Sequence, residues 1–77
     1  MSFKENLQQQ LKEIGYDKLG GILTLSKKTG ISHSTMYDWL NHGKQPHLSS
    51  VLKVLKVINQ RRWLQSKPSI KINDLII

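Results

Sequence analysis

Side chains that could take part in chemistry are concentrated between His33 and Lys44. His33, Ser34 and Asp38 supply the residue types of a hydrolase triad. At helical spacing they fall on one exposed helix face, where water surrounds them, and so short a chain has little room for a water-excluding pocket with an oxyanion hole. The chain also lacks a P-loop sequence. We therefore predict that it is not an enzyme.

The three imidazoles of the chain do not form a recognisable metal-binding pattern. They belong to His33, His42 and His47, and the chain contains no cysteine that could join them. Their spacing matches no known ligand pattern, and the loop around Pro46 separates them from a shared face. We expect neither a bound metal nor another cofactor.

The same polar residues are suited to hydrogen bonding with the base edges of duplex DNA. Helical spacing predicts a helix from His33 to Asn41 that turns Met36, Trp39 and Leu40 inward. The candidate base-reading side chains are His33, Ser34, Thr35, Tyr37 and Asp38. A carboxylate accepts only from cytosine or adenine and repels phosphate, so Asp38 should discriminate between bases more than it adds affinity. Tyr37 could instead pack against the preceding helix.

The charge of the chain favours a polyanionic partner. The 77 residues carry a net charge of +7, and ten basic residues between Lys18 and Lys71 are accompanied by one acid, Asp38. Lysines and arginines that neutralise the phosphates of a nucleic acid release its condensed counterions into solution, which favours binding. The predicted phosphate contacts are Gly21, Lys27, Lys28, Asn41, Lys44, Arg61 and Arg62. Arg61 and Arg62 could equally complement the dipole at a helix C-terminus, and Lys53 and Lys56 fit a solvated face better than a DNA contact.

Helices must position these side chains, and local signals mark where the helices begin and end. Ser2 and Glu5 have the spacing of a capping box, which predicts a first helix over residues 3–14. Gly30 is a natural end for a second helix, and Ser32 can cap the third. With the later segments, the pattern predicts an all-α fold of four or five helices.

The later part of the chain predicts a fourth helix and a tail. This helix runs from about Leu48 to Gln60 and could continue through Trp63. Its predicted inward residues are Leu48, Val51, Leu52, Leu55 and Ile58. Pro68 ends anything helical, and the alternation of polar and apolar residues in Ser69–Asn73 predicts a short C-terminal strand or extended tail. We therefore divide the chain into a domain, residues 1–66, and a tail, residues 67–77.

The segment Gly30-Ile31-Ser32 would join the second and third helices as a helix-turn-helix. The pattern Gly-Ile-Ser-x-Ser-Thr-Met-Tyr-x-Trp-Leu, followed by Pro46 and by Leu52-Lys53-Val54-Leu55, resembles the Cro/phage-repressor-type (Xre) family, and most closely its small HigA-type antitoxins. The resemblance covers roughly residues 19–58. It implies a repressor that binds an operator as a dimer, with the third helix in the major groove.

Two positions depart from the pattern of this family. Ser26 stands where the family usually has alanine, and its small size should preserve the packing. Ile22 stands where many relatives place a glutamine that contacts phosphate. Backbone amides near Gly20 and Gly21 could replace that contact, because a helix N-terminus attracts phosphate.

Apolar residues left over after the core is filled predict a dimer interface. They are Val54, Val57, Trp63, Ile70 and Ile72. Two copies of Ser69–Asn73 could pair as an antiparallel ribbon. The alternative function is that of an antitoxin or protein-binding module, whose tail from Ile70 to Ile77 would hold a toxin or another protein. No segment is apolar enough to span a bilayer or to act as a signal peptide, so we expect no membrane association and a cytoplasmic location.

Overall fold

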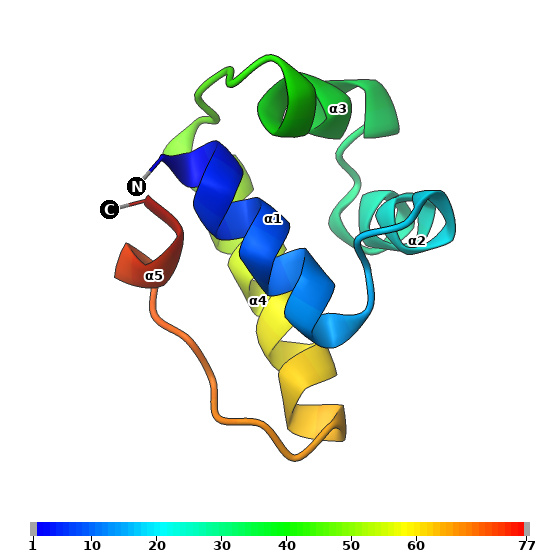
Figure 1. The fold of residues 1–77 in the computed structure, drawn as a ribbon, viewed down its shortest axis with the longest axis vertical. Coiled ribbons are helices and arrows are strands. Elements are labelled where there is room, and N and C mark those ends of the chain that lie inside the picture. Colours follow the sequence, from blue (N-terminus) through cyan, green and yellow to red (C-terminus); the bar gives the residue numbers. More distant parts are fainter. Residues whose placement is uncertain (1, 77) are drawn as a thin grey trace.

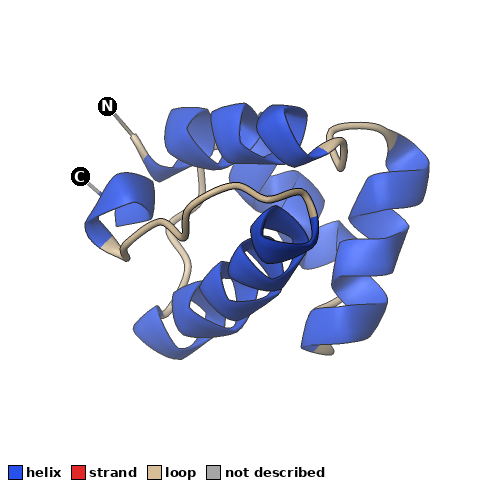
Figure 2. Ribbon diagram, turned by 90° about the horizontal axis from the view of Figure 1, so that it is seen from below, coloured by secondary structure: helices blue, strands red, loops and turns tan. Residues whose placement is uncertain are grey.

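Local capping sets the ends of the early helices in the computed structural model, which describes residues 2–76. The helices are α1 (Phe3–Ile14), α2 (Leu19–Thr29), α3 (His33–Asn41), α4 (Leu48–Leu64) and α5 (Asn73–Ile76). The predicted capping box is present, with the Glu5 amide donating to Ser2 Oγ at 3.2 Å. The all-α class is therefore confirmed, and no strand occurs within residues 2–76 (Figure 2).

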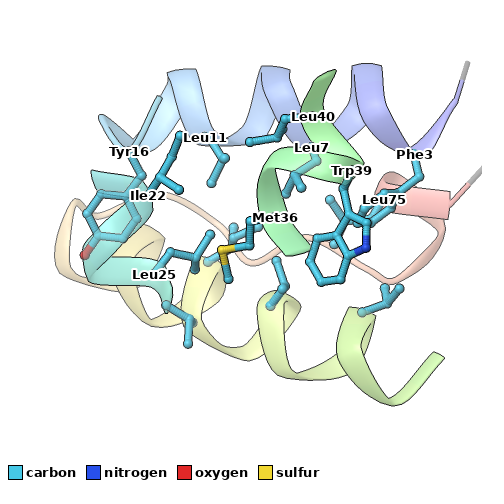
Figure 3. Packing of buried hydrophobic residues seen from close by; sticks show 14 of the residues in the cluster. Phe3, Leu7, Leu11, Tyr16, Ile22, Leu25, Met36, Trp39, Leu40 and Leu75 are labelled. Atoms are coloured by element: carbon cyan, nitrogen blue, oxygen red, sulfur yellow. The ribbon is translucent and has the colours of Figure 1, made fainter. Parts of the chain in front are cut away.

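Helix α1 is the element around which the others are arranged. It packs against α3, α4 and α5, while α2 packs against α3 and α4. In Figure 1, α1 crosses in front of α4, and α2 and α3 lie together on one side of that pair. The core contains Leu7 and Leu11 from α1, Met36 and Trp39 from α3, and Leu75 from the tail (Figure 3).

The inward face of α4 differs from the predicted one. Leu48 and Leu52, which were expected inside, are 60% and 49% exposed. The buried apolar residues of this helix are Val51, Val54, Val57 and Ile58, with Leu55 partly buried. Apolar residues occur around most of α4, so helical spacing alone fits two different faces. Packing against α1 and α2 decides between these faces.

The tail is part of the core and does not form the predicted strand. Residues 67–72 are non-helical, and the chain then turns into α5, which buries Leu75 completely. The side chain of Asn59 on α4 satisfies the backbone polar groups of Ile70, which a neighbouring strand would otherwise bind. Its Nδ2 donates to Ile70 O at 3.0 Å, and its Oδ1 accepts from Ile70 N at 2.8 Å. The side-chain Nδ2 of Asn6 donates to Leu75 O at 3.0 Å. The described tail thus belongs to the same packed unit as residues 2–66, and Ile77 lies outside the described residues.

Arg62 is a buried arginine that joins three parts of the fold. Its Nε donates to Pro68 O at 2.6 Å, and its Nη1 lies 3.1 Å from Gln10 Oε1 and 3.3 Å from Glu13 Oε1. Its side chain is nearly buried, whereas that of Glu13 is partly exposed. The pair therefore links α4 to α1 and to the tail.

We expect Arg62→Ala to lower the free energy of unfolding by about 2–3 kcal/mol, because it leaves a carboxylate and a backbone carbonyl without their shared donor. Urea denaturation followed by circular dichroism measures this change. Lys53→Ala, at an exposed position of the same helix, is the control and should change stability by less than about 0.5 kcal/mol. Equal unfolding midpoints for the two variants would show that Arg62 is not a structural link.

Candidate nucleic-acid interface

The connection between α2 and α3 is held by side chains of α2. Gly30 ends α2 with φ 75°, in the left-handed region that favours glycine. Ser26 Oγ donates to Ile31 O at 2.5 Å, and the Ile31 amide donates to Thr29 Oγ1 at 3.2 Å. From the sequence, only a packing role was expected for Ser26. Its hydroxyl also fixes the turn, and therefore the angle at which α3 leaves α2.

The inner face of α3 is buried as predicted. Met36, Trp39 and Leu40 all lie in the core (Figure 3). The Trp39 ring meets Phe3 edge-on, with centroids 5.8 Å apart and an interplanar angle of 84°. At the start of the helix, Ser32 Oγ accepts from the Thr35 amide at 3.3 Å. Helix α3 is thus fixed both along its inner side and at its N-terminus.

The opposite side of α3 is polar and open to solvent. His33, Ser34, Thr35 and Asn41 are exposed, and the His33 ring lies edge-on to Tyr37 with centroids 6.3 Å apart. Tyr37 is half-buried and lines a depression of about 260 Å³ together with residues of α1 and α2. Tyr37 therefore combines packing against neighbouring helices with contact with solvent.

Asp38 differs from the other polar residues of α3 because its carboxylate already has partners. Oδ1 lies 3.0 Å from His42 Nδ1, and Oδ2 lies 3.6 Å from Lys44 Nζ. The hydrogen bond from His42 is the main cause that holds the pKa of the Asp38 carboxyl below its ordinary value, and the charge of Lys44 acts in the same direction. The carboxylate would therefore repel a phosphate less than an isolated one. Sequence analysis did not identify these partners.

The predicted phosphate contacts do not form one surface. Lys44 lies beside Asp38, and Asn41 lines the depression next to Tyr37. Gly21 lies in the first turn of α2, whose N-cap residue makes no side-chain capping hydrogen bond. Lys27 and Lys28 are exposed in the last turn of α2.

The two arginines of the predicted set are engaged within the fold. Arg61 Nε donates to Ile14 O at 3.3 Å, and its guanidinium lies 5.0 Å from the centre of the Tyr16 ring. Arg62 is buried in the link between α1, α4 and the tail. We therefore no longer assign a phosphate contact to Arg62.

The predicted dimer residues are mostly inside the protomer. Val54 and Val57 belong to the core, and Ile70 and Ile72 are partly buried against it. In this fold the two valines have almost no surface to offer a second copy. Trp63, at 77% exposed, is the most exposed residue of the set. The other large exposed apolar side chains on α4 are Leu48, Leu52 and Leu64.

Comparison of the chain with protein-family models, with curated proteins and with solved structures gave no match. Among the described residues, no group of three or more histidines and carboxylates is placed to hold a metal ion. Within residues 2–76, no helix has the length and apolar character needed to cross a membrane.

Gly21 is required by a close approach of the backbone at the start of α2. A Cβ added there would lie 2.4 Å from Tyr16 Cα, whereas one added at the neighbouring Gly20 would meet nothing within 4 Å. We expect Gly21→Ala to lower the free energy of unfolding by about 1–3 kcal/mol. Gly20→Ala, the matched control, should raise it by up to about 1 kcal/mol through helix propensity. Thermal unfolding measures both, and equal effects would contradict the close approach.

The pairing of Asp38 with His42 can be tested by titration. We expect the carboxyl ¹³C shift of Asp38 to titrate below the ordinary value of 3.8, and the midpoint to rise toward 3.8 in His42→Ala. Because the folded-state pKa is lowered, the pairing stabilises the fold above pH 3.8 and is lost as the pH falls through the folded value. His33→Ala, which leaves this pairing intact, is the control. An unchanged midpoint in His42→Ala would show that the hydrogen bond does not form in solution.

Proposed function

We propose that the chain is a sequence-specific double-stranded DNA-binding transcriptional regulator, a repressor that binds its operator as a dimer. The observation that carries this proposal is the exposed first turn of α3. Three consecutive side chains that hydrogen-bond, those of His33, Ser34 and Thr35, face solvent there while the opposite side of the helix is buried. A helix fixed in this way can enter a major groove as a rigid unit.

The arrangement of α2 and α3 supports the proposal. A short glycine-containing connection joins them, and side chains of α2 hydrogen-bond to that connection. We interpret the pair as a helix-turn-helix of the Cro/phage-repressor type, which is also what the sequence pattern between Gly30 and Leu40 indicates. The net charge of +7 provides attraction for phosphates that does not depend on sequence.

The polar side chains of α3 would have different roles in the recognition of DNA. Ser34 and His33 reach base edges from the first turn, and Thr35 offers both a methyl and a hydroxyl group. Asp38 keeps lone pairs available after its bonds to His42 and Lys44, so it can still accept from cytosine or adenine. Lys44 would bind phosphate and also offset the charge of this carboxylate.

We assign the contact between two copies to the exposed side of the first half of α4. Leu48 and Leu52 lie one turn apart there and are largely exposed. The start of α4 is next to α3, because one depression is lined both by Asp38 and by residues 44–47 and 50. A contact so close to α3 would fix the spacing of two reading helices on adjacent half-sites, about 34 Å apart.

Selection of bound sites from random duplex DNA at two salt concentrations tests this proposal. We expect a symmetric consensus and binding that weakens steeply with salt. Ser34→Ala should cost about 1–3 kcal/mol on the preferred site and relax the preference at one base pair, whereas Lys44→Ala should weaken binding about equally on all sequences. Lys53→Ala is the control cation on α4. The absence of a consensus would exclude sequence-specific reading, and an asymmetric single half-site would exclude the dimer.

A further inference from the structure

A groove with a volume of about 690 Å³ lies beside the C-terminal half of α4. In Figure 1 this end of α4 is at the bottom of the molecule, whereas α3 is at the top. The groove is lined by two apolar residues, Trp63 and Leu64, and by four cations, Lys28, Lys56, Arg61 and Lys67. Two of these cations, Lys28 and Arg61, belong to the predicted phosphate contacts, but none of the lining residues lies on α3.

Two large apolar side chains are left in water at this groove. Trp63 and Leu64 are 77% and 66% exposed, although the other tryptophan of the chain, Trp39, is buried. Single exposed apolar residues are common, but adjacent ones that line a concave surface are typical of interaction sites. Tryptophan is also the residue that most often anchors a binding partner.

The cations around the groove keep their charge available. Arg61 donates to the carbonyl oxygen of Ile14, and Lys67 Nζ donates to the carbonyl oxygen of Glu13, so both bonds are to neutral groups. Within residues 2–76, none of the four cations forms an ion pair, and no acid lines the groove. The groove therefore attracts a negatively charged ligand.

The walls of the groove are held in place before any ligand binds. Asn59, on the lining face of α4, is bonded twice to the backbone of Ile70. The Lys67 amide donates to Arg62 O at 2.8 Å, which holds the chain where it leaves α4. In a preformed groove, binding carries no free-energy cost for ordering the backbone of the groove.

We infer that this groove binds an acidic polypeptide segment of a partner protein. An apolar side chain of the segment would lie against Trp63 and Leu64, and its carboxylates would face the four cations. This complementarity of charge and apolar surface selects the occupant. The inference does not depend on DNA binding by α3.

Other occupants fit the groove less well. A second copy placed by a two-fold axis would bring four cations against four cations, which repel. A bilayer surface is flat, so it could touch the exposed side chains of Trp63 and Leu64 but would not fill a concave site. Single-stranded nucleic acid stacks successive bases on aromatic rings, whereas this groove offers one aromatic ring next to an aliphatic side chain.

Selection from a displayed library of random peptides, carried out on the full chain, tests the inference. We expect the enriched peptides to share a net negative charge and at least one large apolar residue. In titrations of a selected peptide, Lys56→Glu and Trp63→Ala should each weaken binding by about tenfold or more. Lys53→Glu on the same helix and Leu23→Ala on α2 are matched controls at exposed positions outside the groove and should leave affinity unchanged. Circular dichroism establishes that all four variants are folded.

Three results would overturn the inference. The first is enrichment of neutral or basic peptides, or no enrichment at all. The second is equal loss of affinity in the groove variants and in their controls. The third is that binding of a single-stranded oligonucleotide, or of vesicles containing an anionic phospholipid, depends on Lys56 and Trp63, whereas binding of the selected peptides does not.

Binding to the selected duplex DNA site is measured in parallel. Weaker DNA binding in Ser34→Ala but not in Trp63→Ala would separate the two surfaces.

Discussion

The burial of the inner face of α3 against α1 is the constraint on which the rest of the structure depends. Met36, Trp39 and Leu40 are removed from water there, and each such side chain contributes about 1.5–3 kcal/mol. The ring of Phe3 packs on Trp39, and Gln8 Nε2 donates to Leu40 O at 2.9 Å. Because α3 cannot rotate without exposing these groups, its polar side must face solvent. The polarity of the exposed surface is thus a consequence of core packing.

The few acids of the chain determine where its positive charge remains active. Glu13 is paired with the buried Arg62, and Asp38 is hydrogen-bonded to His42 and ion-paired with Lys44. The first pair stabilises the fold, and the second sets the charge on the exposed side of α3. The cations beside Trp63 have no such partner within the described residues. The positive charge of the chain is therefore least compensated by acids at the groove along α4.

Features that are determined by residues close together in the sequence could be predicted, whereas features that depend on residues far apart in the sequence could not. The capping box at Ser2, the cap at Ser32 and the inner face of α3 depend on residues within a few positions, and all were predicted correctly. The register of α4 and the course of the tail were not, because they depend on partners far along the chain. Arg62 bonds to Glu13 and Asn6 bonds to Leu75, and no local pattern indicates either pair. The polar residues of α3 could be found from spacing, but the partners of Asp38 required the loop that follows.

The two surfaces that we propose to bind ligands are formed by different helices. The C-terminal end of α4, which lines the groove, and α3 lie toward opposite ends of a molecule whose longest extent is 31 Å, whereas Lys28 of the groove is on α2, five residues before His33 (Figure 1). At physiological ionic strength, interactions between exposed charges are screened over about 8 Å. An acidic segment held beside Lys56 and Lys67 would therefore change the local potential at α3 little, and a partner could be held there while α3 occupies DNA. Coupling between the groove and α3 could pass through α4, which begins beside α3 and ends in the groove, or through α2, which carries Lys28 and packs against α3.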